Sequence, residues 1–238
     1  MSQIKKEKIS VIIPVFNEYE SIGKVLDAIP KSLIEEIIVV DNGSTDGSDN
    51  MARKHGATVI KEPERGYGSA CLKGISYLTE NAQPHILVFL DGDFSDYPED
   101  MVLLIDKIRE GYDFVLGSRV LGVEMGMGKL SSHSILGNKL AAFFLRWFFG
   151  GNFTDLGPFR AIRFDKLLQL KMADRNFGWT MEMQIKAVRH NLKISEIPVH
   201  YRQRFGGTSK VTGTFRGSLK AFAKITLIVL LYFFRIKK

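Results

Sequence analysis

The chain has 238 residues, 45% of them hydrophobic, so it can bury one substantial core and lacks the composition of a disordered protein. Its single cysteine, Cys71, excludes an internal disulfide framework and fits a reducing compartment. The lysine-bearing N-terminus has no apolar stretch before the first predicted strand, so no secretory signal is expected. The formal net charge is +7, and much of the excess lies between Arg189 and Lys238. This charge indicates an anionic partner: nucleic acid, a phosphorylated substrate or an anionic lipid surface.

Short β-branched runs alternate with amphipathic stretches along the first half of the chain. Strands are expected at residues 9–15, 35–40, 57–61, 86–90 and 114–117. Helices are expected between them, over 21–29, through 54, through 78 and over 99–109. The alternation predicts an α/β fold with a mostly parallel sheet and right-handed crossovers. Pro14, near the end of the first run, predicts that this strand stops being hydrogen-bonded there.

Acidic residues follow three of the predicted strands. Glu18 comes after the first, Asp41 after the second, and Asp91-Gly92-Asp93 after the fourth. The carboxyl ends of parallel strands meet at one edge of a sheet, which is where ligands bind in open α/β folds. A single acidic turn is also explained by Asp91 or Asp93 capping the helix that follows. Three acidic turns on one edge predict a pocket.

Two aspartates separated by one residue can converge on a hard cation. Mg²⁺ and Mn²⁺ prefer carboxylate oxygens and are commonly shared with substrate phosphates. The glycine-rich motifs of dinucleotide-binding and P-loop proteins are absent from the sequence. Phosphates would therefore meet carboxylates, which is favourable only when a divalent cation bridges them. The pattern predicts a metal-bridged nucleoside diphosphate.

Several motifs together resemble a known family. The segments PVFNE (14–18), VVDNGSTDG (39–47), LDGD (90–93) and GSR (117–119) are similar to those of inverting family 2 glycosyltransferases, which have the Rossmann-like GT-A fold of nucleotide-diphospho-sugar transferases. TDLGPFRAIR (154–163), GWTMEM (178–183) and EIPVHYRQRFGGTSKVTG (196–213) resemble the branch of dolichol-phosphate mannosyltransferases and polyprenyl-phosphate glucosyltransferases. The resemblance implies one GT-A domain over residues 1–217.

The resemblance also implies which residues bind the donor. The nucleotide-sugar site would comprise Pro14, Phe16, Glu18, Asp41, Asp91, Gly92 and Asp93. Asp91 and Asp93 would hold Mg²⁺ or Mn²⁺, and Asp41 would contact the base. Asp93, Asp155 and Arg119 are the implied catalytic residues, with Arg119 facing the transferred phosphate or sugar. Ser95 stands where the mannosyltransferase branch has a glutamine that helps to hold the metal.

A basic segment near residue 200 predicts the acceptor site. The residues assigned to the acceptor phosphate are Arg119, Arg202, Arg204, Ser209 and Lys210. Guanidinium groups match phosphate oxygens bidentately, and alternating arginines on a strand point to one side. RNA is the rival partner for this segment, which lacks the interleaved aromatic residues of a stacking platform.

Asp155 lies where glycosyltransferases with hydroxyl acceptors often place a general base. A hydroxyl nucleophile must lose its proton, whereas a phosphate is already ionised and needs no base. Asp155 is therefore a candidate site residue whose role depends on the acceptor. Lys129 and His133, in the glycine-rich segment 120–136, are further candidate acceptor contacts on what the family makes a mobile loop. Glu182 and Lys186 have the i,i+4 spacing of a helix-surface ion pair, and the motif match gives Glu182 a sugar-facing or structural role as the alternative.

Two apolar segments predict contact with a membrane. Residues 137–149 form an apolar helix with Lys139 and Arg146 on one stripe, which suits either a membrane interface or a buried core. Residues 225–234 are uncharged but would span only about 15 Å of a bilayer core of about 30 Å, so they cannot cross it. Basic residues flank that run, which predicts an interfacial helix over 218–238 on an anionic leaflet.

The predicted function is transfer of a hexose, with inversion, from a UDP-glucose or GDP-mannose type donor to dolichyl or undecaprenyl phosphate. The enzyme would act on the cytoplasmic face of a membrane as a peripheral protein. The first alternative is a glycosyltransferase of the same fold that acts on a lipid or saccharide hydroxyl, with Asp155 as the base. The second is a non-catalytic, membrane-associated nucleotide-binding module, against which the intact D-x-D motif and the basic segment argue.

Overall fold

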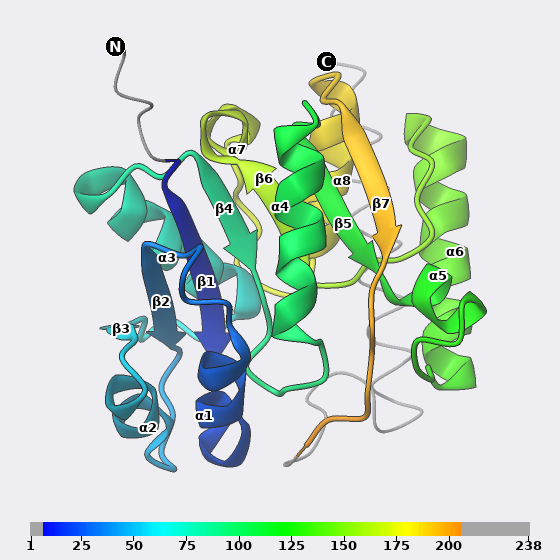
Figure 1. Ribbon diagram of the computed structural model, residues 1–238. Coiled ribbons are helices and arrows are strands. Elements are labelled where there is room, and N and C mark those ends of the chain that lie inside the picture. Colours follow the sequence, from blue (N-terminus) through cyan, green and yellow to red (C-terminus); the bar gives the residue numbers. More distant parts are fainter. Residues whose placement is uncertain (1–6, 206–238) are drawn as a thin grey trace.

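The computed structural model describes residues 7–205, apart from the side chains of residues 132–134. A sheet of seven strands in the order β3-β2-β1-β4-β6-β5-β7 runs through the protein (Figure 1). The strands are β1 (Ile9–Val15), β2 (Glu36–Asp41), β3 (Thr58–Lys61), β4 (Ile86–Phe89), β5 (Phe114–Ser118), β6 (Arg160–Arg163) and β7 (Ile194–Pro198). Every pairing in the sheet is parallel except the two made by β6, so the predicted mostly parallel α/β fold is confirmed.

Helices cover both faces of the sheet. They are α1 (Tyr19–Ala28), α2 (Ser48–Lys54), α3 (Tyr67–Asn81), a 3₁₀ turn (Pro98–Asp100), α4 (Met101–Arg109), α5 (Arg119–Glu124), α6 (Ser132–Phe149), α7 (Phe164–Leu170) and α8 (Trp179–Arg189). Alternate strand residues point to opposite faces. One set packs with α1 and α4, and the other packs with α3, α7 and α8. Strands buried on both faces need continuous apolar runs, which explains the sequences of β1, β2 and β4.

One local expectation about the sheet was wrong, and the strands β6 and β7 were not predicted. β1 pairs with β2 beyond Pro14, as far as Val15 opposite Asp41, although its pairing with β4 ends at Ile12. Proline lacks only its own N–H, so the strand continues along one neighbour. β6 was not predicted, because four residues with an arginine at each end carry no apolar run. It forms a strand because β4 and β5 flank it on both sides.

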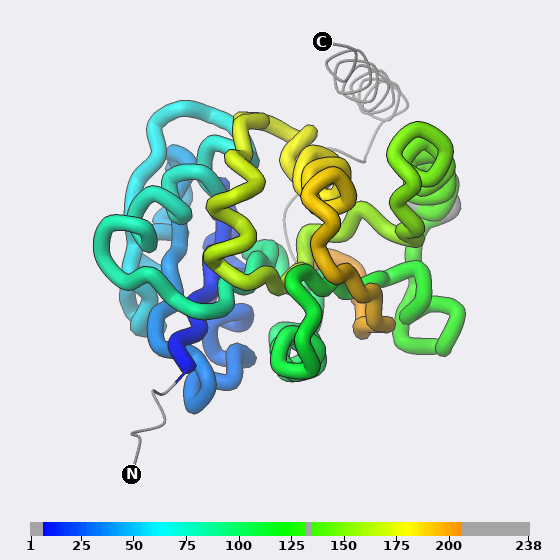
Figure 2. The backbone as a smooth tube through the Cα atoms, turned by 90° about the horizontal axis from the view of Figure 1, so that it is seen from above, coloured from blue at the N-terminus to red at the C-terminus, as the bar shows by residue number. Residues whose placement is uncertain are grey.

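The segment expected to be an irregular loop is largely helical. It contains α5, capped by the Ser118 hydroxyl, which accepts a hydrogen bond from the Leu121 N–H at 3.1 Å. It also contains the start of α6, five residues before the predicted start at residue 137. In Figure 2, α6 stands at one side of the protein, away from β1 and β2.

The helix α6 has one buried face and one exposed face. Ala141 and Leu145 are buried, whereas Leu136, Phe143 and Trp147 are 67%, 56% and 75% exposed. One face of this helix therefore belongs to the core, and the membrane interface stays a prediction for its exposed face. Among the residues that the structure describes, no helix is long and apolar enough to span a bilayer. The interfacial helix predicted over 218–238 and the domain boundary at residue 217 lie outside the described residues.

Candidate active site

The carboxyl ends of β1, β2 and β4 bring the predicted acidic residues to one edge of the sheet. The Asn42 N–H donates to the Val15 carbonyl at 2.8 Å, which keeps the ends of β1 and β2 together. The turn after β4 lies against β1 at Gly92, where a Cβ atom would stand only 3.0 Å from Val15 Cγ2. Gly92 therefore permits the close approach that places its two flanking aspartates at this edge.

Glu18 and Asp93 are joined by one guanidinium group. Arg204 Nη1 lies 3.0 Å from Glu18 Oε1, and Arg204 Nη2 lies 3.0 Å from Asp93 Oδ2. The other oxygen of Asp93, Oδ1, accepts hydrogen bonds from the N–H and hydroxyl of Ser95 at 2.9 and 2.6 Å. Arg204, predicted to bind the acceptor, thus lies on the carboxylates assigned to the donor. Ser95, in the position of the family's metal-binding glutamine, orients Asp93.

Arg202 has different partners. Its guanidinium carbon lies 3.5 and 3.9 Å from the ring centroids of Phe94 and Tyr97. Its Nε donates to the Phe94 carbonyl at 2.7 Å. The expectation that Arg202 and Arg204 point to one side of a strand was wrong, because residues 202–204 form no strand. Arg202 ties its segment to the loop after the D-x-D motif. Ser209 and Lys210 lie outside the described residues.

The remaining donor-site predictions fall on the same edge. Pro14 is on β1, directly opposite Val40 of β2. The Phe16 ring lies 3.8 Å from the guanidinium carbon of Arg65, a cation–π contact. Asp41 is buried and its Oδ1 accepts the Ser44 N–H at 2.9 Å, which shapes the loop after β2.

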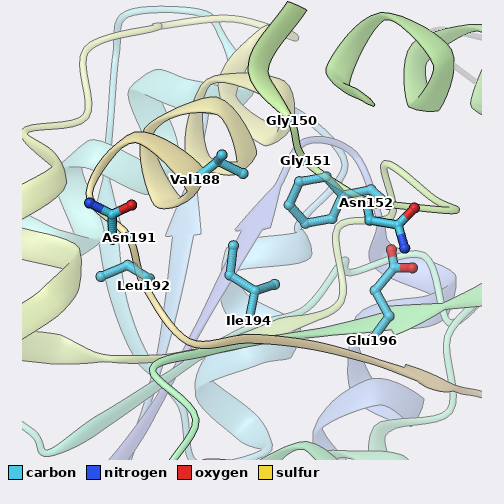
Figure 3. A pocket seen from close by; sticks show the side chains of 9 residues that line it. Gly150, Gly151, Asn152, Val188, Asn191, Leu192, Ile194 and Glu196 are labelled. Atoms are coloured by element: carbon cyan, nitrogen blue, oxygen red, sulfur yellow. The ribbon is translucent and has the colours of Figure 1, made fainter. Parts of the chain in front are cut away.

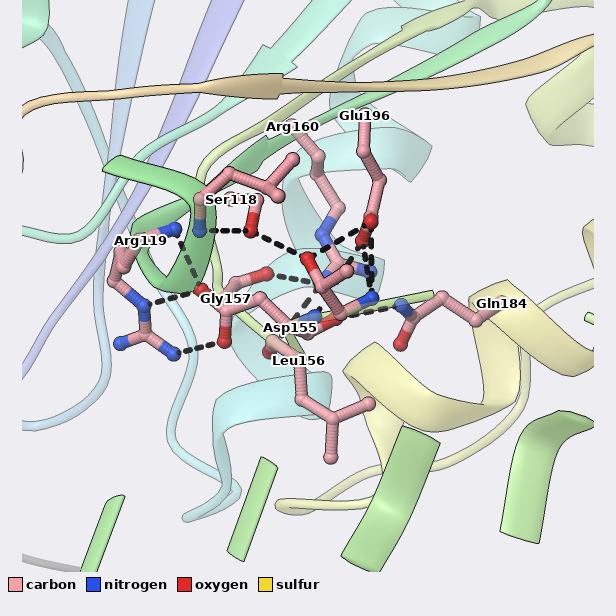
Figure 4. Close-up of polar contacts among 10 residues, drawn as sticks. Ser118, Arg119, Asp155, Leu156, Gly157, Arg160, Gln184 and Glu196 are labelled. Atoms are coloured by element: carbon pink, nitrogen blue, oxygen red, sulfur yellow. Dashed lines mark hydrogen bonds and ion pairs between the residues drawn. The ribbon is translucent and has the colours of Figure 1, made fainter. Parts of the chain in front are cut away.

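Arg119 and Asp155 form a buried bidentate ion pair (Figure 4). Arg119 Nε and Nη2 each donate to a different oxygen of Asp155 at 2.8 Å, and the Arg119 N–H adds a third bond at 2.9 Å. Burial raises the pKa of Asp155, but the charge and hydrogen bonds of Arg119 outweigh it and hold this pKa below its usual value. A carboxylate with both oxygens occupied and a low pKa is a poor general base.

The loop that carries Asp155 is held from behind by residues of three other elements (Figure 4). Glu196 of β7 accepts the Thr154 N–H at 2.9 Å, and Gln184 of α8 donates to the Asp155 carbonyl at 2.9 Å. Arg160 of β6 donates to the Gly157 carbonyl and, at 3.1 Å, to that of Thr180. Arg160 is completely buried, and this burial lowers its pKa to about 10. The role of Arg160 was not predicted, because a lone arginine in a short segment is expected to lie on the protein surface.

Glu182 forms the predicted ion pair with Lys186, at 2.7 Å between Oε1 and Nζ. The expectation that this pair lies on the helix surface was wrong, because the Glu182 side chain is fully buried. Its carboxylate also accepts the N–H groups of Ala173 and Asp174. Glu182 therefore anchors the segment before α8.

Two further residues, Lys129 and His133, were candidate acceptor contacts. Lys129 is exposed, and its neighbour Gly128 forms an isolated β-bridge with Tyr201. The side chain of His133 lies outside the described part of the structure.

Two further carboxyl groups have buried oxygen atoms without a hydrogen bond among the described residues. Asp91 Oδ1 has no hydrogen bond, and neither has either oxygen of Asp96. Burial, reinforced by the charge of Asp93, raises the pKa of Asp91 to about 7. Burial likewise raises the pKa of Asp96 well above its usual value, with Arg119 opposing the shift. Asp96 was not predicted, because a sequence gives no sign of how deeply a turn aspartate is buried.

The strand-end carboxylates fit a divalent cation that is shared with a substrate. Asp91 offers an unpartnered oxygen, and Asp93 lies two residues away on the same turn. Within residues 7–205, no group of three or more histidine, cysteine or acidic side chains is arranged to hold a metal by itself. Mg²⁺ and Mn²⁺ are commonly bound by one or two carboxylates together with substrate phosphates and water. The donor set therefore suits a metal that arrives with a diphosphate.

A cavity of about 630 Å³ lies elsewhere, between the end of α6, the end of α8 and β7 (Figure 3). Its lining includes Gly151, Asn152, Val188, Asn191 and Glu196. It contains none of the strand-end carboxylates. It adjoins the site described above through Glu196, which also holds the Asp155 loop.

Comparisons with known proteins identify the family. Residues 10–170 match the model of glycosyl transferase family 2. An uncharacterized glycosyltransferase of Mycobacterium tuberculosis strain H37Rv is 34% identical over 217 residues, which are 90% of this chain and 94% of the relative. The undecaprenyl-phosphate mannosyltransferase of Micrococcus luteus is 29% identical over 221 residues, 87% of this chain and 88% of the relative.

Solved structures show the same fold. Glucosyl-3-phosphoglycerate synthase of Mycobacterium tuberculosis, in complex with Mn²⁺, UDP and glucosyl-3-phosphoglycerate, superposes with a TM-score of 0.73 and 22% identity. The match covers 95% of this chain and 80% of that one. The same synthase has also been solved with Mg²⁺ and UDP. The GT-A fold, the ordered motifs and the match over two thirds of the sequence place this chain in glycosyl transferase family 2.

Proposed function

We propose that this protein transfers a hexose, with inversion, from a nucleotide sugar to a polyprenyl phosphate. The Arg119–Asp155 pair carries this proposal. Asp155 occupies the place of a general base, yet both of its oxygens are bound by Arg119. An acceptor that is already ionised needs no base, and a phosphate is such an acceptor. The 29% identity to an undecaprenyl-phosphate mannosyltransferase supports the same acceptor class.

The acidic sheet edge is the proposed donor site. Asp91 and Asp93 would hold Mg²⁺ or Mn²⁺, as the fold neighbours do with UDP. When bound, the metal would neutralise the charge that develops on the departing nucleoside diphosphate. Arg204, which bridges Glu18 and Asp93, would donate to the donor diphosphate. Phe16 and Asp41 would contact the nucleoside.

The acceptor phosphate is proposed to approach from the Arg119 side. The guanidinium of Arg119 is held rigidly by Asp155 and lies 5.2 Å from the Tyr201 ring centroid. A fixed guanidinium aimed at the reacting centre offsets the repulsion between two anionic substrates and aligns them for in-line attack. Asp155 is then a positioning residue, because it acts through Arg119.

A comparison of acceptors tests the function. Purified protein is incubated with Mn²⁺ or Mg²⁺, with UDP-glucose or GDP-mannose, and with undecaprenyl phosphate, dolichyl phosphate or the free alcohol undecaprenol. We expect a glycosyl phosphoryl lipid, detected by mass spectrometry, from a polyprenyl phosphate and none from undecaprenol. Product from undecaprenol alone would favour the hydroxyl-acceptor alternative. Binding without any product would favour the non-catalytic module.

A polyprenyl acceptor requires contact with a membrane, and α6 offers a surface for it. We define the α6 stripe as Leu136, Phe143 and Trp147, which lie on one exposed side of the helix. The rings of Phe143 and Trp147 stack, with centroids 6.1 Å apart. Lys139 and Arg146 are exposed on the same helix. Exposed aromatic residues with flanking cations are typical of a helix that lies in the interface of an anionic leaflet.

We expect the double substitution Phe143→Ser, Trp147→Ser to weaken binding to phosphatidylglycerol-containing vesicles by at least about tenfold, since each buried apolar side chain contributes roughly 1.5–3 kcal/mol. Co-sedimentation measures the bound fraction. Leu168→Ser on α7, a residue that is 43% exposed, is the matched control and should bind as the wild type does. Equal binding by all three proteins would remove the α6 stripe from the membrane contact.

A further inference from the structure

Asp96 is a buried acidic residue that the donor and acceptor roles above do not use. Only 2% of its surface is exposed, and neither carboxyl oxygen has a hydrogen-bond partner among the described residues. Buried polar side chains nearly always have such partners, and leaving them unpaired destabilises the fold. A carboxyl group with both oxygens unpaired is therefore unfavourable in the ligand-free protein. A ligand that hydrogen-bonds these two oxygens would remove this cost.

The backbone holds Asp96 in the middle of the site. Asp96 pairs with Tyr201 in an antiparallel bridge, and its carbonyl accepts the Arg202 Nη2 at 3.3 Å. The Tyr201 ring lies beside the Arg119 guanidinium. Asp96 follows Asp93 by three residues, and the charges of Arg119, Asp91, Asp93 and Asp155 all act on its pKa. Asp96 therefore lies near both the metal-binding turn and the Arg119–Asp155 pair.

The candidate ligands differ in what they offer a carboxyl group. A phosphate has only acceptor oxygens and would be repelled by an ionised Asp96. A divalent cation is already assigned to Asp91 and Asp93, and a metal role for Asp96 would make its loss weaken the binding of nucleoside diphosphate and of nucleotide sugar equally. Sugar hydroxyl groups both donate and accept hydrogen bonds, and they can satisfy two oxygens of one carboxyl at once.

We propose that Asp96 is a sugar-recognition residue whose two carboxyl oxygens hydrogen-bond hydroxyl groups of the transferred hexose. This inference rests on the proposed nucleotide-sugar donor. It gives the enzyme a means of selecting the hexose, because a buried group built to bind a hydroxyl is left unpaired by a sugar that lacks that hydroxyl or points it elsewhere. Arg119 on one side and Asp93 on the other would fix the sugar between the acceptor phosphate and the leaving diphosphate.

Comparing the affinities for nucleoside diphosphates and for nucleotide sugars tests whether Asp96 contacts the sugar part of the donor. Calorimetry with Mn²⁺ measures the affinity of wild-type protein, Asp96→Ala and Asp96→Asn for UDP and GDP, and for UDP-glucose, UDP-galactose and GDP-mannose. We expect Asp96→Ala to lose at least about tenfold in affinity for the preferred nucleotide sugar. Its affinity for the matching nucleoside diphosphate should stay within about twofold. Asp165→Asn, which changes an exposed aspartate on α7, is the control and should match the wild type.

Thermal unfolding without ligand supplies the second measurement. If Asp96 serves a ligand, Asp96→Asn should leave the melting temperature unchanged or raise it, because it replaces a buried ionisable group with a neutral one and breaks no side-chain hydrogen bond. A clear fall in melting temperature would make Asp96 a structural residue and overturn the proposal. Equal losses for diphosphate and nucleotide sugar would also overturn it, in favour of a metal or phosphate role. Wild-type protein that binds no nucleotide at all would overturn the proposed function itself.

Discussion

Asp93→Ala is expected to reduce sugar transfer by at least about 10³-fold, because the metal that it helps to hold supplies several kcal/mol of charge stabilisation to the leaving diphosphate. Steady-state transfer to undecaprenyl phosphate measures the loss. Asp93 also accepts hydrogen bonds from Ser95 and Arg204, so a parallel measurement of thermal unfolding is needed. We expect the fold to survive, since Arg204 keeps its contact with Glu18.

The matched control for this experiment is Asp106→Ala on α4. Asp106 is an exposed carboxylate that pairs with Arg109 on the helix surface. Its loss should leave transfer unchanged, because exposed ion pairs contribute little to stability and this one is not among the strand-end carboxylates. Turnover by Asp93→Ala above about a tenth of the wild-type rate would contradict the metal role of the D-x-D turn.

Asp155→Ala is expected to lower the free energy of unfolding by about 3–5 kcal/mol, the usual cost of leaving one charge of a buried pair without its partner. The side chain of Asp155 is fully buried and that of Arg119 is 16% exposed. Urea denaturation measures the change. A double-mutant cycle with Arg119→Met isolates the pair, because the double variant leaves no buried charge unpaired and should be less destabilised than the sum of the two single variants.

The same pair makes a prediction about pH. The pKa of Asp155 in the folded protein is lower than in the unfolded chain, so the ionised form stabilises the fold. This contribution is complete above the unfolded pKa of about 3.9 and is lost as the pH falls towards and through the folded value. The wild-type protein should therefore lose more stability than Asp155→Ala between about pH 5 and pH 2. Parallel acid-unfolding curves for the two proteins would exclude the ion pair as a major contributor.

The strand-end carboxylates illustrate what local sequence predicts well. Each of the three acidic turns follows an apolar run short enough to be one buried strand, and parallel strands place their carboxyl ends on one edge. The predicted α/β fold, the positions of Glu18, Asp41 and Asp93, and the family all follow from this pattern and from the motifs in their order. Neighbouring residues are enough for these predictions, because a strand and its turn are defined within ten residues.

The partners of these side chains were not predictable in the same way. Arg204 reaches Glu18 across 186 positions of sequence and so lies on the donor carboxylates, although its segment resembled an acceptor site. Arg119 meets Asp155 across 36 positions, and that contact occupies both oxygens of a residue that the sequence offered as a general base. Such contacts depend on how β5, β6 and β7 assemble. The short sequence of β6 has no apolar run that would predict an antiparallel strand between two others.

Burial shows most clearly the difference between features that the sequence predicts and features that only the tertiary structure decides. By itself, the sequence determined the α/β architecture, the acidic sheet edge and the membership of family 2, because apolar periodicity and ordered motifs are properties of short segments. Only the tertiary structure decided that Asp96, Arg160 and Glu182 are buried, and that one side of α6 remains exposed. The physical reason is that burial and pKa depend on which distant elements pack over a residue. The assembled fold decides whether a charged side chain is solvated, paired or buried without a partner.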